Sequence, residues 1–81
     1  MIHIEDNHNI GYSKITLTGD TLNYLIDIIR WLETNEVPLL NSSNGKNYTV
    51  QINSSTFDLE YCLIATSFSN EKRMLFKLTF S

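Results

Sequence analysis

The stretch that decides the fold is Thr18-Gly-Asp-Thr-Leu-Asn-Tyr-Leu-Ile-Asp-Ile-Ile-Arg-Trp-Leu-Glu-Thr34. Its first four residues offer capping side chains and an acid for the positive end of a helix dipole. Apolar residues then recur at spacings of three and four, which indicates an amphipathic helix; they are Leu22, Leu25, Ile26, Ile28, Ile29 and Leu32. The helix is predicted to stop near Asn35, because Pro38 disfavours helical geometry in the residue before it.

The residues before this helix predict a β-hairpin. Ile2 and Ile4 alternate with polar residues, as do Ile15 and Leu17, and a turn-rich stretch separates the two runs. Period-2 alternation around such a stretch is typical of two antiparallel strands. Pairing Ile4 with Ile15, and Ile2 with Leu17, places all four side chains on one face, so we expect that face to meet the helix.

The residues after the helix predict a loop and then a three-stranded meander. Residues 39–47 contain Asn-Ser-Ser-Asn-Gly, which favours a loop. Residues 48–52, 57–66 and 74–80 each alternate apolar and polar side chains. Matching apolar faces across strands predicts four opposed pairs: Ile52 with Phe57, Val50 with Leu59, Leu63 with Phe76, and Tyr61 with Leu78.

These elements give the order ββαβββ, an α+β fold in which one amphipathic helix packs on one face of a mainly antiparallel sheet. The chain has 81 residues, enough for one core. We therefore expect a single domain spanning residues 1–81.

Composition and charge exclude several classes of function. The net charge is −3 and the six lysines and arginines are scattered, so no basic stripe exists to bind nucleic acid. One cysteine allows no internal disulfide, and no apolar run approaches the roughly 20 residues that span a bilayer. No signal peptide is recognisable after Met1, which predicts a cytoplasmic protein. Nine asparagines beside a single alanine suggest an AT-rich genome, such as that of a low-GC bacterium or its phages and plasmids.

Candidate chemical sites are weak. His3, Asp6 and His8 are metal-ligand types, but a fourth ligand at diagnostic spacing is missing. Cys62 falls in mid-strand, where the predicted register places Lys77 beside it, but neither histidine is near in sequence to activate it. Asp58 and Glu60 share one face of a strand, where solvated carboxylates are common. A lone glycine ahead of the helix does not make a phosphate loop. The sequence therefore predicts no catalytic residue, no metal and no cofactor.

Two surfaces are candidates for binding a protein. Tyr24 and Trp31 lie seven residues apart on one line of the helix, outside the apolar stripe, with Asp27 and Asp20 nearby. The alternative is that both rings cover the sheet margin. The second surface is the sheet face away from the helix, where an apolar centre with a charged rim is expected; its residues are Asp58, Glu60, Cys62, Ile64, Arg73, Leu75 and Lys77. The alternative there is an ordinary solvent face.

The segment Leu25-Ile-Asp-Ile-Ile-Arg-Trp-Leu-Glu33 followed by a β-meander resembles two groups of small proteins. One group is the anti-CRISPR and related anti-defence proteins of phages and mobile elements, and the other is the immunity proteins that neutralise a toxin. The resemblance implies a non-enzymatic inhibitor that binds another protein, with acids such as Asp20, Asp27, Asp58 and Glu60 meeting a basic nuclease, CRISPR effector or toxin.

Two further hypotheses remain open at this point. The chain could be a structural or accessory subunit that forms a homodimer through the open sheet face or an edge strand. It could also be a small ligand-binding domain or an enzyme, which would need a pocket that the sequence does not indicate.

Overall fold

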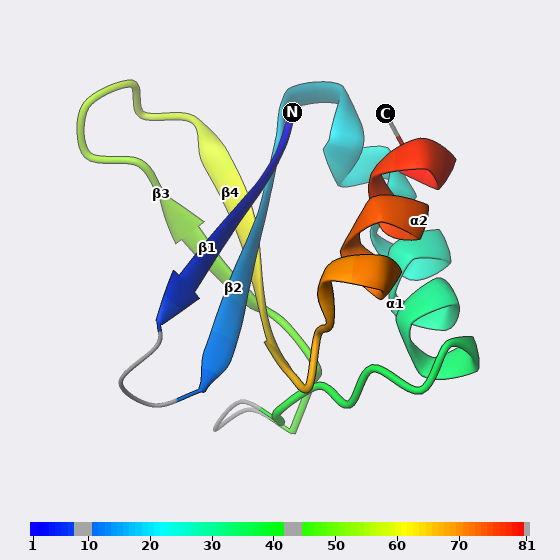
Figure 1. Ribbon diagram of the computed structural model, residues 1–81. Coiled ribbons are helices and arrows are strands. Elements are labelled where there is room, and N and C mark those ends of the chain that lie inside the picture. Colours follow the sequence, from blue (N-terminus) through cyan, green and yellow to red (C-terminus); the bar gives the residue numbers. More distant parts are fainter. Residues whose placement is uncertain (8–10, 42–44, 81) are drawn as a thin grey trace.

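The computed structural model describes residues 1–7, 11–41 and 45–80, and in these ranges a four-stranded sheet carries a layer of helices on one face (Figure 1). The strands are β1 (Ile2–Asn7), β2 (Tyr12–Thr18), β3 (Thr49–Ile52) and β4 (Leu59–Thr66), all antiparallel in the order β1-β2-β4-β3. The helical elements are the 3-10 helix η1 (Gly19–Tyr24), α1 (Leu25–Thr34) and α2 (Asn70–Phe80). The predicted α+β class and the antiparallel sheet are confirmed.

The first hairpin has the predicted register. Ile2 lies opposite Leu17 and Ile4 lies opposite Ile15. Ile15 and Leu17 are fully buried, whereas Ile2 and Ile4 on the edge strand are half-buried. Matching apolar side chains across the pair was enough to fix this register, because a slip by one residue would turn them to solvent.

The central helix forms where it was expected, but it begins differently. Gly19 takes a φ of +61°, which glycine adopts without strain, and the chain enters a 3-10 turn before α1 starts. Leu25, Ile28 and Leu32 are buried against the sheet, and the helix ends at Thr34 as predicted. Ile26, however, is 57% exposed and does not belong to the core.

The predicted last strand is wrong, because residues 70–80 form helix α2. The Ser69 hydroxyl accepts a hydrogen bond from the Lys72 amide at 3.3 Å, which caps the helix, and Glu, Lys, Arg, Met and Leu in its middle favour helix. Phe76 and Phe80, four residues apart, face inward together. The strand that pairs with β4 in place of the predicted last strand is β2, so Leu63 lies opposite Ile15 and Tyr61 lies opposite Leu17.

The predicted pairing of β3 with β4 is displaced by two residues. Ile52 lies opposite Leu59 and Val50 opposite Tyr61, whereas Phe57 belongs to the turn. The Asn53 side chain explains the longer turn, because its Oδ1 accepts the backbone N–H groups of Ser55 and Thr56. A shift by two keeps each side chain on its predicted face.

The core lies between the sheet and the two helices. Its fully buried members come from β2, β4, both helices and the segment after α1; they are Ile15, Leu17, Ile28, Leu32, Val37, Leu63, Ala65 and Phe76. At the start of the predicted loop over residues 39–47, Leu39 pairs with Ala65 of β4 and the Leu40 N–H donates to the Ile64 carbonyl oxygen. Residues 42–44 of that loop lie outside the described residues.

Candidate functional site

The first predicted binding surface spans η1 and α1, and the structure divides it. Tyr24 is 49% exposed, and Asp27 and Asp20 are also exposed. Trp31 instead packs beneath α2, with its ring centroid 5.4 Å from that of Phe76 and 6.4 Å from that of Phe80. The predicted aromatic pair is therefore separated, because the segment expected to extend the sheet covers Trp31 as a helix.

The second predicted surface is not assembled. Ile64, Cys62 and Glu60 lie on the sheet face away from the helices, the last two buried, and Asp58 lies in the turn before β4. The other three residues are carried by α2, on the opposite side of the sheet; they are Arg73, Leu75 and Lys77. Of the three residues of metal-ligand type considered above, His3 and Asp6 lie on opposite faces of β1, whereas His8 lies outside the described residues.

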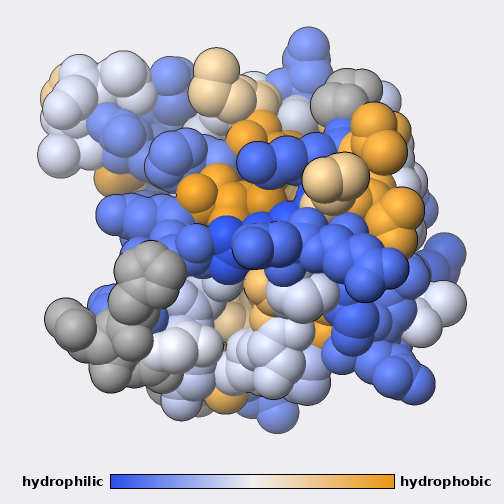
Figure 2. Space-filling model, viewed as in Figure 1, coloured by the Kyte–Doolittle hydropathy of each residue, from blue (hydrophilic) through white to orange (hydrophobic). Residues whose placement is uncertain are grey.

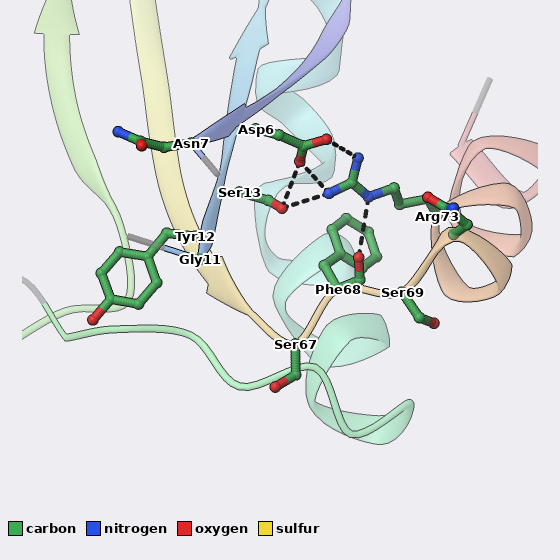
Figure 3. Close-up of a pocket in the computed structure, with 10 residues that line it drawn as sticks. Asp6, Asn7, Gly11, Tyr12, Ser13, Ser67, Phe68, Ser69 and Arg73 are labelled. Carbon is green, nitrogen blue, oxygen red and sulfur yellow. Dashed lines mark hydrogen bonds and ion pairs between the residues drawn. The ribbon is translucent and has the colours of Figure 1, made fainter. Parts of the chain in front are cut away.

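Arg73 forms a polar network that joins α2 to the first hairpin (Figure 3). Its guanidinium makes a bidentate ion pair with Asp6 and donates to the Ser13 Oγ at 2.6 Å, and that hydroxyl donates to the Asp6 Oδ1 at 2.9 Å. Its Nε donates to the Phe68 carbonyl oxygen at 3.1 Å. The hydrogen bond to Asp6 raises the pKa of Arg73, and the charge of Asp6 adds to this rise while partial burial opposes it.

These groups line a hollow of about 520 Å³ between the β1–β2 hairpin and the start of α2. Ser67, Ser69 and Tyr12 complete its wall. Arg73 would be the natural group to hold an anion here, but its guanidinium already faces Asp6 and Ser13. The network is therefore best understood as a clamp that fixes α2 on the sheet.

Replacing Arg73 with Met should lower the free energy of unfolding by about 1–3 kcal/mol, because Asp6 and Ser13 would lose their charged partner. Urea denaturation followed by circular dichroism measures the change. Lys77→Met, one turn further along on an exposed position, is the matched control and should stay within about 0.5 kcal/mol of wild type. A double-mutant cycle with Asp6→Asn should give a coupling energy near 1 kcal/mol or more; additivity would contradict the clamp.

A second, apolar groove of about 400 Å³ runs between β1 and α2. Ile2 and Ile4 line it on one side, Phe76 and Phe80 on the other, and Lys77 stands at its rim. Figure 2 shows hydrophobic surface gathered in this region. The groove is the seam where the helix meets the edge strand, and its walls belong to side chains that also pack against the core.

The β3–β4 hairpin carries an exposed apolar surface that the sequence analysis did not single out. Along its helix-side face, exposure rises from 0% at Leu63 to 41% at Leu59, 53% at Val50 and 66% at Ile52. The turn beyond adds Phe57, which is 82% exposed. Figure 1 shows the loop of this hairpin reaching away from the helix layer, which explains the exposure. We call Val50, Ile52, Phe57 and Leu59 the hairpin surface.

Phe57 is the least expected member of the hairpin surface. Its φ is +60°, a region that disfavours side chains with a Cβ, and bulky residues are rarely found there. An aromatic ring in that conformation gains nothing from burial in this chain, because 82% of it is exposed. The conformation closes the turn, because the Phe57 N–H donates to the Asn53 carbonyl oxygen at 2.8 Å and the Asn53 N–H donates to the Asp58 carbonyl oxygen at 2.9 Å. The exposed ring, in contrast, contributes little to the packing of the fold. The signal in the sequence was the Asn-Ser-Ser-Thr turn, whose length determines whether Phe57 belongs to a strand or to the turn.

In the ranges that the structure describes, no helix is long and apolar enough to cross a membrane. No family model, curated protein or solved structure matches the chain.

Proposed function

We propose that this chain is a non-enzymatic protein that binds another protein through the hairpin surface and blocks it, in the manner of anti-CRISPR or toxin-immunity proteins. The observation that carries the proposal is Phe57, a fully presented aromatic ring held at positive φ. Aromatic side chains are the commonest anchors of protein interfaces, where they fill a pocket on the partner.

The energetics favour a ring that is buried only in a complex. The left-handed conformation costs roughly 1–2 kcal/mol in the free chain. Burying a Phe side chain gains about 1.5–3 kcal/mol, so docking on a partner offsets the cost. Val50, Ile52 and Leu59 extend the apolar contact along the same face.

The charge of the chain supports a basic partner. Asp58 is exposed next to Phe57, and the whole chain carries a net charge of −3. Acids at the rim of an apolar contact speed association with a basic surface and disfavour acidic ones. A nuclease or another protein with a basic working surface fits this pattern, which is also what the resemblance implies.

The test is Phe57→Asn, because Asn tolerates positive φ and removes the ring. Its free energy of unfolding should be no lower than that of wild type and up to about 1 kcal/mol higher. Affinity for a protein captured by wild type from the host lysate should fall by about 100-fold, measured by calorimetry with the purified partner. Unchanged affinity would sink the proposal.

Glu36→Asn is the matched control for this experiment. Glu36 is also exposed at positive φ, 59°, but lies after α1. Glu36→Asn therefore relieves the same kind of backbone strain at a position distant in sequence from the hairpin surface. The affinity for the partner should stay at the wild-type value.

A further inference from the structure

The sheet order leaves β3 as an edge strand, and within residues 1–7, 11–41 and 45–80 no other strand pairs with its outer side. Its hydrogen-bonded neighbour is β4, and its four residues, Thr49-Val-Gln-Ile52, are all exposed. They include no charge and no proline, two of the devices by which proteins prevent an edge from pairing with another chain, and the four-residue length of β3 is the one such device present.

The opposite edge is protected. β1 carries His3, Glu5 and Asp6 among its six residues, and the Asp6 carboxylate is tied to Arg73 of α2. Strand addition at β1 would have to accommodate these groups, whereas β3 presents only neutral side chains. The two edges of one sheet therefore differ in their capacity to pair.

We infer that β3 pairs with β3 of a second copy of this chain, antiparallel and about a two-fold axis. The sequence of β3 is self-complementary in the register that places Gln51 opposite Gln51 of the second copy. Val50 then lies opposite Ile52 of the other chain, and vice versa, on one face. In this register apolar side chains lie opposite apolar ones and uncharged polar side chains lie opposite uncharged polar ones, so no like charges meet.

The helix layer leaves room for this pairing. The two-fold axis of this pairing is perpendicular to the sheet, so the helix layers of both chains lie on the same side of the joined sheet. The two layers would collide if α1 covered β3. The exposure of Val50 and Ile52 shows that it does not. The dimer joins two four-stranded sheets into one and sets the two hairpin surfaces side by side. Phe57 takes no part in the strand pairing, because it lies outside β3.

The contact is small, since each chain contributes a four-residue strand. Interfaces of this size are weak, so we expect a dissociation constant of roughly 10–100 μM. Sedimentation equilibrium from about 5 to 500 μM should show the mass rising from the 9.4 kDa of one chain toward twice that value. A constant mass of one chain over this range would overturn the inference.

A charge swap tests the pairing of β3 directly. One variant carries Val50→Glu and Ile52→Glu, and the other carries Val50→Lys and Ile52→Lys; both positions are exposed and face the neutral Tyr61 and Leu59 within the chain. Each variant alone sets like charges opposite each other and should associate at least about 30-fold more weakly than wild type. An equimolar mixture pairs Glu with Lys and should recover association. Failure of the mixture to associate more tightly than either variant alone would overturn the inference.

The control places the same charges on another exposed apolar site. Met74 and Leu78 of α2 are 65% and 73% exposed, and their Glu and Lys double variants should dimerise like wild type. Loss of the dimer in these variants would move the interface to α2. Sedimentation needs no partner protein, and Phe57→Asn should lose partner affinity while keeping the dimer. A failure of the dimer is therefore distinguishable from a failure of the proposed function.

Discussion

Phe76→Ala should lower the free energy of unfolding by about 3–5 kcal/mol, because it empties the middle of the core. Phe76 is fully buried and makes ring contacts with Trp31, Phe68 and Phe80 at centroid separations of 5.4, 5.7 and 5.1 Å. A chain of this size has a total stability of about 4–12 kcal/mol, so the variant should be marginal or unfolded at 25 °C.

Thermal unfolding followed by far-UV circular dichroism measures this change, and Tm should fall by more than about 10 °C. Leu78→Ala is the matched control, on the same helix but 73% exposed, and should change stability by no more than about 0.5 kcal/mol. The pair also tests α2 itself. In the strand first predicted for residues 74–80, both side chains would face the core and both substitutions would be costly.

Trp31→Ala should cost about 3 kcal/mol, whereas Tyr24→Ala should cost less than about 1 kcal/mol. Trp31 packs edge-on against Phe76 and Phe80, and Tyr24 is 49% exposed. Tyr24 ends η1 and Trp31 lies in α1, so the difference between the two variants measures the cover that α2 gives to Trp31 and not to Tyr24. Trp31 is the one tryptophan of the chain, so its replacement removes the tryptophan fluorescence signal. Urea denaturation of both variants is therefore followed by circular dichroism.

Trp31→Phe serves as the control, since it keeps an aromatic ring in the site and should recover most of the lost stability. Equal, small effects at Trp31 and Tyr24 would contradict the packing of α2 on α1. The folded Tyr24→Ala variant also separates two binding surfaces. Loss of partner affinity in this variant would place the interface on α1, whereas the hairpin surface predicts no change.

The elements with strong local signals were predictable. The first hairpin followed from matching Ile2 and Ile4 to Leu17 and Ile15, and α1 followed from a helical repeat bounded by Thr18 and Pro38. In both cases one periodicity fits the residues and the other does not. The order of these periodic segments also sufficed to predict the α+β class and the antiparallel sheet.

The candidate site was much less predictable, because it depends on which residues the fold leaves uncovered. The sequence left open whether Tyr24 and Trp31 form a binding surface or cover the sheet margin. In the structure Tyr24 is exposed, whereas α2, which was predicted to be a strand, covers Trp31. The hairpin surface was missed because Val50, Ile52 and Leu59 alternate like core residues. Alternation shows which side chains share a face, but not whether another layer covers that face.

The sequence by itself determined the first hairpin, the position and end of α1, and the faces of β3 and β4. Only the tertiary structure decided the state of residues 70–80. Their apolar positions 74, 76, 78 and 80 satisfy a strand, while Phe76 and Phe80, four residues apart, satisfy a helix. The helix buries Phe76 against Trp31 and brings Arg73 to Asp6. These stabilising contacts are made with residues that are distant in the sequence, so the local periodicity of residues 70–80 does not predict them.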